Sequence, residues 1–294
     1  RILNNSVYVD SSATNGGLNK SANITLYNVG NRFSNPIILR NGAACPGSVC
    51  TNFTALTATN VIFGVTGWSN YSIGNVSNLT ACGNITQPGT YTLLNNVNSA
   101  GTCFNITSHD VVLDCNSYTI TGTQNGQGVY ILNKVNATVK NCIITNFSTA
   151  MYIAGVNNSI FLNDTIKNNN GAFAGIYSYN SNYNNFTNIN FTFNNASSNA
   201  GLYLNVSSNN NLVNNTFIAN NVTSGTDING GGIVGVYNLS MNNTLTNTMF
   251  SSNRVVTTGG STHINGGGIL GIYLNSNNSV ITNTQILNNF VNAS

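Results

Sequence analysis

The segment "INGGGIVGVYNLSMNNTLTNTMF", residues 228–250, is nearly repeated as "INGGGILGIYLNSNNSVITNTQI", residues 264–286. Repetition at a regular period is the sequence signature of architectures built from stacked units. Each segment contains a tyrosine, Tyr237 or Tyr273, and an asparagine ten residues later, Asn247 or Asn283. These two markers provide a register that can be followed through the rest of the chain.

Traced towards the N-terminus, the two markers define six repeats. The tyrosines are Tyr130, Tyr152, Tyr177, Tyr203, Tyr237 and Tyr273, and the asparagines are Asn141, Asn163, Asn188, Asn214, Asn247 and Asn283. Each tyrosine precedes its asparagine by ten or eleven residues, whereas the spacing between successive asparagines increases from 22 to 36 residues. The constant part therefore predicts two strands with their corner, and the variable part predicts a loop.

Repeats of this kind predict a parallel β-helix. The shortest repeat has 22 residues and shows strand-like alternation without helical periodicity. In a parallel β-helix each repeat forms one coil, and successive coils hydrogen-bond at about 4.8 Å, so that like residues stack. We therefore expect the six asparagines to form a buried ladder of amides and the six tyrosines to stack in the core.

The region before the repeats has a different character. All three prolines and the single tryptophan lie at or before residue 88, and segments such as "ANITLYNV" are typical of antiparallel strands. We expect a small β-sandwich-like domain over residues 1–78, then a linker and N-terminal cap of the β-helix over 79–110. A parallel β-helix of about seven coils follows over 111–294. The predicted fold class is all-β.

Six cysteines predict three disulfides. The expected pairs are Cys45–Cys50, Cys82–Cys103 and Cys115–Cys142. The cysteines do not form a Cys/His pattern with zinc spacing, and the four residues between Cys45 and Cys50 do not match a redox motif. Disulfides favour an oxidising, extracellular compartment.

Asn-X-Ser/Thr sequons recur along the chain, although 62 asparagines in 294 residues generate many by chance. We expect glycans on exposed sequons, and the candidates are Asn23, Asn52, Asn70, Asn84, Asn105, Asn136, Asn205, Asn238 and Asn277. Asn163 and Asn214 also begin sequons, but the buried position expected for them leaves no room for a sugar.

Charge limits the range of functions. The chain has eight Lys and Arg, five Asp and no Glu, and its net charge of +3 is not gathered into a basic run. Nucleic acid is therefore not expected as a partner. No apolar run approaches the ~20 residues of a membrane-spanning helix. Hydrolysis of sugars needs two carboxyl groups within about 10 Å of each other, and five scattered Asp without any Glu scarcely allow such a pair. We therefore expect no enzymatic activity, no catalytic or metal-binding residue and no cofactor.

One pair of ionisable residues occupies equivalent positions in neighbouring repeats. "TDINGGG" contains Asp227, and "THINGGG" contains His263. Such a pair can serve in proton transfer or as half of a metal site. Because the sequence offers no nucleophile or third ligand beside it, a cross-coil ion pair on a loop is the favoured interpretation.

Two resemblances point in the same direction. The coils "GVYILNKVNATVKNCIITNF" and "AMYIAGVNNSIFLNDTIKNN" resemble the right-handed β-helix repeats of periplasmic copper-processing proteins and of carbohydrate-binding and sugar-hydrolase families, over about residues 82–294. The segments "NKSANITLYNVGNRFSNPIILRNGAACPGSVC" and "CGNITQPGTYTLLNNVNSAGTCFNITSHDVVLDCNSYTITG" resemble archaeal extracellular surface proteins, over about residues 15–120. The first resemblance implies a right-handed β-helix, and the second implies a place on the cell surface.

Two classes of function remain. The first is a non-catalytic, glycosylated cell-surface protein that assembles head-to-tail into a filament, sheath or S-layer-type lattice. The second is a carbohydrate-binding or carbohydrate-processing β-helix. The inserted loops "NNVTSGTDINGG" and "RVVTTGGSTHINGG" carry no aromatic side chain to support a sugar, which favours the first class.

The two ends of the sequence suggest how assembly could occur. Ile281, Ile286 and Phe290 lie in the last repeat, where we expect an open end of the β-helix. The alternating segment over residues 1–12 could pair with the exposed edge of another chain. The alternative is that residues 1–12 fold into their own sandwich.

Overall fold

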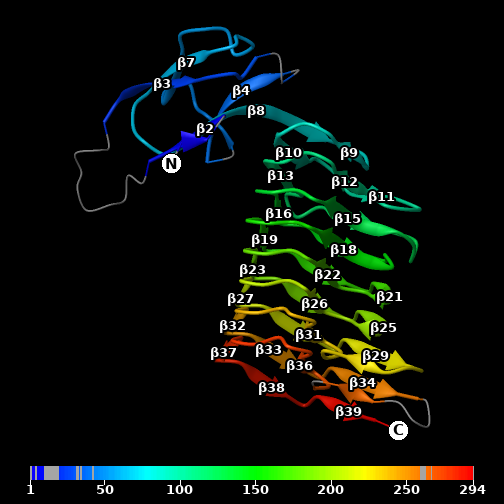
Figure 1. Cartoon of the computed structure of the whole chain (residues 1–294). Helices are drawn as coiled ribbons and strands as arrows, with labels where there is room; N and C mark the ends of the chain where they lie inside the picture. Colours follow the sequence, from blue (N-terminus) through cyan, green and yellow to red (C-terminus); the bar gives the residue numbers. More distant parts are fainter. Residues whose placement is uncertain are drawn as a thin grey trace. The chain divides into compact units, whose positions relative to one another are not determined.

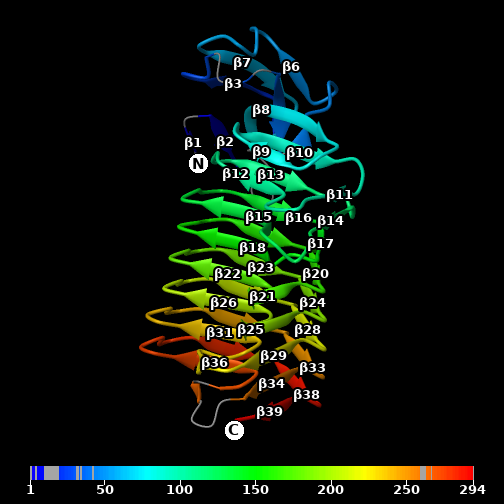
Figure 2. The same cartoon turned by 90° about the vertical axis from the view of Figure 1, so that its right-hand side faces the viewer.

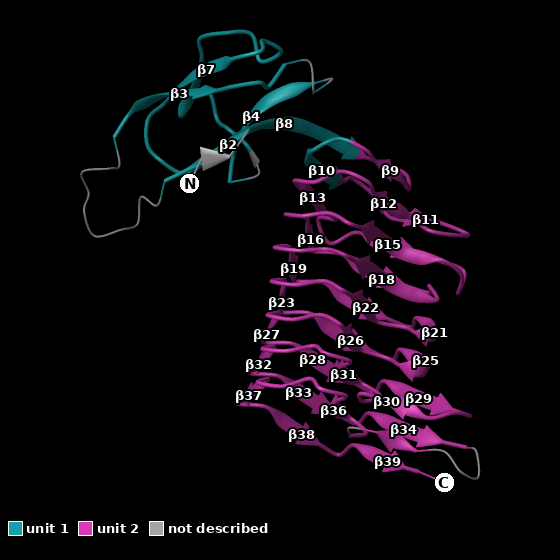
Figure 3. Ribbon diagram, in the orientation of Figure 1, with its two compact units in different colours: residues 1–78, 87–92 teal, residues 79–86, 93–294 magenta. Residues whose placement is uncertain are grey.

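The computed structural model describes residues 2–3, 5–9, 20–30, 33, 35–41, 43–258, 263–265 and 267–293. Within these residues the regular secondary structure consists of β-strands, which confirms the all-β prediction. The chain divides into two compact units (Figure 3). One comprises residues 1–78 and 87–92, and the other comprises residues 79–86 and 93–294.

The first unit contains two sheets of antiparallel strands around a common core. One has the antiparallel strands β1 (Ile2–Leu3), β2 (Ser6–Tyr8), β8 (Asn70–Leu79), β4 (Pro36–Arg40) and β5 (Ala43–Ala44). The other has β3 (Ala22–Leu26), β7 (Val61–Val65) and β6 (Cys50–Asn52). β10 (Gly89–Leu93) lies beside β8 and is not one of these antiparallel strands. Both sheets contribute to the core, for example Ile24 and Phe63 from one and Ile38 and Tyr71 from the other. Two sheets packed on one core form a β-sandwich.

The N-terminal segment belongs to this sandwich. β2 pairs antiparallel with β8, with Ser6 opposite Ser72 and Tyr8 opposite Asn70. Val7, between them, is buried in the core. The prediction that this strand is free to pair with another chain is therefore wrong for β2, whose backbone partner lies in its own sheet. Residues 10–12 lie outside the described part of the chain.

The second unit is a stack of parallel coils (Figures 1 and 2). The tyrosine sheet contains β9 (Gly83–Ile85), β12 (Phe104–Ile106), β15 (Gln127–Leu132), β18 (Thr149–Ala154), β22 (Ile176–Tyr179), β26 (Leu202–Asn205), β31 (Val234–Tyr237) and β36 (Leu270–Tyr273). The second sheet contains β13 (Val111–Asp114), β16 (Thr138–Lys140), β19 (Ile160–Leu162), β23 (Asn185–Thr187), β27 (Asn211–Val213), β32 (Thr244–Thr246) and β37 (Val280–Thr282). The third sheet contains β11 (Val97–Asn98), β14 (Thr119–Thr121), β17 (Ile143–Thr145), β20 (Thr165–Lys167), β24 (Asn190–Thr192), β28 (Thr216–Ile218), β33 (Met249–Ser251) and β38 (Gln285–Leu287). The predicted parallel β-helix is thus confirmed.

In the repeats that follow Asn163, the variable segment is more than a loop. It contributes a fourth parallel sheet of β21 (Asn170–Phe173), β25 (Asn195–Asn199), β29 (Asn221–Ser224), β34 (Arg254–Thr257) and β39 (Phe290–Asn292). In the two longest repeats it also contributes the pair β30 (Ile228–Asn229) and β35 (Ile264–Asn265). Gly231 and Gly267 follow these strands at φ 103° and 123°, a backbone conformation that favours glycine. The prediction of a loop was therefore wrong for these repeats, because their added residues include a further strand.

Coils also begin earlier than the sequence suggested. β9 and β12 already pair in parallel register, with Asn84 opposite Asn105, and β12 pairs in the same way with β15. The segment 79–110, predicted as a linker and cap, thus already supplies strands to the β-helix.

All three predicted disulfides are present: Cys45–Cys50, Cys82–Cys103 and Cys115–Cys142. The last two join neighbouring coils across Cα–Cα distances of 4.7 Å. In the chain-entropy model, a closed loop of 27 residues corresponds to a stabilisation of about 3–4 kcal/mol.

The asparagine column is stacked, but it lies on the surface. Asn188 Nδ2 donates to Asn163 Oδ1 at 3.1 Å, and Asn247 Nδ2 donates to Asn214 Oδ1 at 3.1 Å. Asn141 is half-buried, and Asn163, Asn188, Asn214, Asn247 and Asn283 are exposed. All six have positive φ, between 47° and 57°. The predicted burial was wrong because these residues form left-handed corners, which asparagine tolerates better than most residues.

The amides that are buried lie at other corners. The longest buried ladder contains Asn169, Asn194, Asn220 and Asn253, each at most 1% exposed, and continues to the half-buried Asn289. Asn194 Oδ1 accepts from the N–H of Asn169 at 3.1 Å and from its Nδ2 at 3.0 Å. Asn194 Nδ2 donates to Ile166 O at 2.9 Å and to Asn220 Oδ1 at 3.0 Å. One side chain therefore satisfies polar groups in the coils on both sides of its own.

Asp164 takes the place of an amide in a parallel column. Its Oδ1 accepts the N–H of Cys142 at 2.8 Å, as Asn215 Oδ1 accepts the N–H of Ile189 at 2.9 Å. Asn215 Nδ2 also donates to Phe186 O, whereas the buried Asp164 Oδ2 has no partner in the described residues. Burial raises the pKa of Asp164 well above its usual value, and the charge of Asp114 adds to the shift, against backbone hydrogen bonds that lower it.

Replacing a buried amide should therefore destabilise the β-helix far more than replacing a corner amide. Asn194→Ala leaves buried donors and an acceptor without partners, and we expect it to lower the free energy of unfolding by about 3 kcal/mol or more. Asn188→Gly, in the same repeat, keeps the left-handed corner and should lower it by less than about 1 kcal/mol. Urea-induced unfolding followed by circular dichroism measures both; equal effects would contradict the buried ladder.

Asp164→Asn should stabilise the protein near neutral pH, by about 1–3 kcal/mol, because the new amide can donate where Asp164 Oδ2 has no partner. Since burial favours the neutral form of Asp164, its contribution to stability should fall as pH rises above about 4, the unfolded pKa, until the folded pKa is reached. The variant should lose this pH dependence. The exposed control Asp110→Asn should keep it, and thermal melts across the pH range would contradict the prediction if Asp164→Asn kept it too.

Candidate functional site

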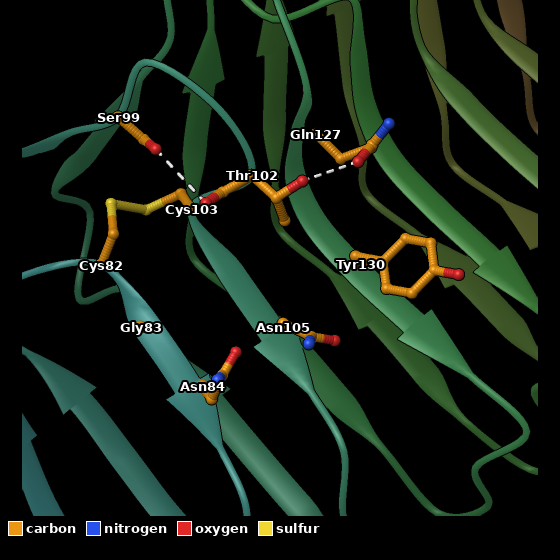
Figure 4. Close-up of a pocket in the computed structure, with 9 residues that line it drawn as sticks. All are labelled: Cys82, Gly83, Asn84, Ser99, Thr102, Cys103, Asn105, Gln127 and Tyr130. Carbon is orange, nitrogen blue, oxygen red and sulfur yellow. Dashed lines mark hydrogen bonds between the residues drawn. A yellow bond between two sulfur atoms is a disulfide. The ribbon is translucent and has the colours of Figure 1, made fainter.

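A polar groove of about 550 Å³ lies at the first coils of the tyrosine sheet in the second unit (Figure 4). It is lined by Cys82, Gly83, Asn84, Ser99, Thr102, Cys103, Asn105, Gln127 and Tyr130. β9, β12 and β15 supply its floor, and the segment between β11 and β12 supplies Ser99 and Thr102. In the sequence, Asn84 and Asn105 are recognisable only as sequons and Tyr130 only as a repeat marker. Ser99, Thr102 and Gln127 carry no motif and could not be recognised.

The groove is neutral and rich in hydrogen-bonding groups. Thr102 Oγ1 donates to Gln127 Oε1 at 2.7 Å, and Ser99 Oγ donates to Thr102 O at 3.3 Å. The side chains of Asn84 and Asn105 make no hydrogen bond within the described residues, and both line the groove. Hydroxyl, amide and aromatic groups without charge suit a neutral polyhydroxy ligand.

A column of tyrosines extends from this groove along the sheet. The rings of Tyr130, Tyr152, Tyr177, Tyr203, Tyr237 and Tyr273 stack with centroid separations of 5.2–6.0 Å. The predicted stacking is present, but the predicted place in the core was wrong. In β15 the neighbours Val129 and Ile131 are fully buried while Tyr130 is half-exposed, so the tyrosine lies on the outer face.

The column also shifts in register. Tyr130, Tyr152, Tyr177 and Tyr203 are direct strand partners, but Tyr203 lies opposite Gly235, and Tyr237 lies opposite Asn205. A side chain on Gly235 would collide with the ring of Tyr203. Gly235 therefore leaves room for this ring, which is only 6% exposed, and burial raises the pKa of Tyr203.

Tyr130 is the first ring of the column and has one free face. One face stacks on Tyr152 at 5.3 Å. On the other side the strand partner of Tyr130 is Asn105, not an aromatic residue. Tyr130 therefore borders the groove with a face that no other aromatic ring of the described residues covers.

The structure brings Asp227 and His263 together as predicted. His263 Nδ1 lies 3.4 Å from Asp227 Oδ1, and the His263 N–H donates to the same oxygen at 2.7 Å. The two side chains are 71% and 46% exposed, so the ion pair contributes little to stability. In the described part of the chain, no three His, Cys, Asp or Glu side chains gather into a group that could hold a metal ion.

Six of the nine candidate sequons are exposed, and three are half-buried. Asn23, Asn52, Asn70, Asn84, Asn136 and Asn277 are exposed, and Asn105, Asn205 and Asn238 are half-buried. Asn163 and Asn214, which were expected to be too deeply buried for a glycan, are exposed corner residues. The structure thus removes the reason for excluding them. No helix among the described residues is long and apolar enough to cross a membrane.

Comparison with known proteins agrees with this geometry. No curated protein matches the chain. A family model described as "Right handed beta helix region" matches residues 84–266, which is more than half of the chain and includes the groove strands β12 and β15. The chain therefore belongs to the right-handed β-helix family.

Proposed function

We propose that this protein is a non-catalytic structural protein of the cell surface, a rigid subunit of a filament, sheath or S-layer-type lattice. The buried amide ladder carries this proposal. Its four buried asparagines each bond to the coils on both sides, so that the coils resist being separated one at a time. A stack held in this way suits a durable fibre or stalk.

Several features support an extracellular location. Three disulfides are typical of proteins in an oxidising compartment, and two of them join successive coils. The exposed sequons are suited to covalent N-glycans. The resemblance of about residues 15–120 to archaeal surface proteins agrees with this location.

Self-association is proposed through the coil formed by β37, β38 and β39. Ile281 is 44% exposed, whereas its partner Leu245 in the preceding coil is 5% exposed. Ile286 is 53% exposed, whereas its partner Phe250 is fully buried. A second copy stacked on this coil would bury these side chains, and repetition of a head-to-tail contact builds a filament.

Carbohydrate binding is the second candidate function. The neutral groove with the free face of Tyr130 favours it, and the absence of aromatic residues from the inserted loops no longer counts against it. A carbohydrate-processing role has no comparable support, because no carboxyl group lines the groove.

Ile286→Lys should abolish assembly of the native protein, since it places a charge within the apolar surface that the next copy would cover. Tyr183→Lys is the matched control: Tyr183 is 60% exposed at a corner of an earlier coil, so its replacement should leave assembly intact. Electron microscopy and sedimentation at increasing protein concentration provide the measurement. Filaments of normal length from Ile286→Lys would contradict stacking through this coil, and dispersed monomers of the unmodified protein would contradict self-association.

A further inference from the structure

The groove beside Tyr130 contains a sequon whose amide has no other role. Asn105 begins the sequence Asn105-Ile106-Thr107 and lies on β12, directly between Asn84 and Tyr130 on the neighbouring strands. Its side chain lines the groove and makes no hydrogen bond in the part of the chain described by the structure. By contrast, Asn194 uses its whole amide in the buried ladder. The amide of Asn105 is thus not engaged in the structure, and it lies in a groove that three strands hold in place.

We propose that Asn105 carries an N-linked glycan whose first sugar packs in this groove against the free face of Tyr130. The inference rests on the proposed extracellular location. In the transfer, Asn105 Nδ2 forms a bond to C1 of the sugar and loses one proton. The C1–O bond of a diphosphate-activated glycosyl donor breaks, and the diphosphate leaves with that oxygen and the bonding electrons.

The position of Asn105 determines where the first sugar lies. Neighbouring strands are separated by about 4.8 Å, so a sugar on Asn105 lies next to the ring of Tyr130, whereas one on Asn84 is a further strand away. The C–H groups on one face of a pyranose are apolar and can pack on the face of an aromatic ring. Figure 4 shows Asn84, Asn105 and Tyr130 on adjacent strands along the groove.

The rest of the groove can bind the polar groups of the sugar. Gln127 and Thr102 are hydrogen-bonded to each other at the rim, and Ser99 lies beside them. Their remaining donor and acceptor capacity suits sugar hydroxyl and N-acetyl groups. The groove volume of about 550 Å³ is within the range of small-ligand sites.

The first test is intact-glycopeptide mass spectrometry of the native protein. We expect a glycan on Asn105 and on Asn277, an exposed sequon of the last coil that serves as the reference. A glycan on Asn277 with an unmodified Asn105 would overturn the inference and leave the extracellular proposal standing. The complete absence of glycans would overturn both.

The second test asks whether the sugar occupies the groove. Asn105→Gln should lower the midpoint of thermal unfolding by about 2–4 °C, the shift expected for loss of one modest contact in a chain of this size. The control Asn277→Gln should leave it unchanged. In a Tyr130→Leu background the effect of Asn105→Gln should disappear, and in a Tyr130→Phe background it should persist, because phenylalanine keeps the aromatic face.

A Tm effect of Asn105→Gln that is unchanged by Tyr130→Leu would overturn the packing of the sugar on the ring. An unmodified Asn105 together with saturable binding of free N-acetylglucosamine, followed by titration of the Gln127 and Tyr130 resonances, would also overturn the proposal. In that case the groove would be a site for an external sugar.

Discussion

The β-helix depends on hydrogen bonding of polar groups at its corners. Where the chain turns between sheets, backbone N–H groups face the interior. No carbonyl oxygen of a neighbouring strand is in position to accept their hydrogen bonds. A buried polar group without a partner costs about 1–3 kcal/mol, and each coil has several corners. Asparagine oxygens such as those of Asn194 and Asn220, and hydroxyls such as that of Ser207, fill this need coil after coil. Apolar stacking of Phe191, Phe217 and Phe250 can then occupy the space between the corners.

The same constraint explains which positions of the repeat serve the structure and which can vary with function. Interior positions are committed to the ladder and the core, so chemical variation is confined to the outer face and to the variable segment. The tyrosine column covers the outer face of one sheet and ends at the groove, where Asn105 takes the place of a ring beside Tyr130. The groove thus arises where the repeat pattern is interrupted. Disulfides such as Cys82–Cys103 join the coils beside it.

The repeat markers allowed the parallel β-helix, the order of the coils and the disulfide Cys115–Cys142 to be predicted. The constant distance from tyrosine to asparagine within each repeat fixes which strands must pair, because only one register places Tyr130 on Tyr152 and Cys115 on Cys142. The groove could be predicted only in part. Asn84, Asn105 and Tyr130 belong to patterns, but Ser99, Thr102 and Gln127 come from segments whose path no repeat defines.

The sequence by itself determined which residues stack on one another. Only the tertiary structure decided whether a stacked column faces the core of the β-helix or the solvent. Asn163 and Asp164 are neighbours, yet the first is exposed and the second is buried. A single left-handed residue at the corner, Asn163 at φ 57°, reverses the direction in which the next side chain points. This turn depends on how the neighbouring coils pack. It does not change the number of residues between the equivalent positions of successive repeats. The periodicity of the sequence is therefore the same whether a column faces the core or the solvent.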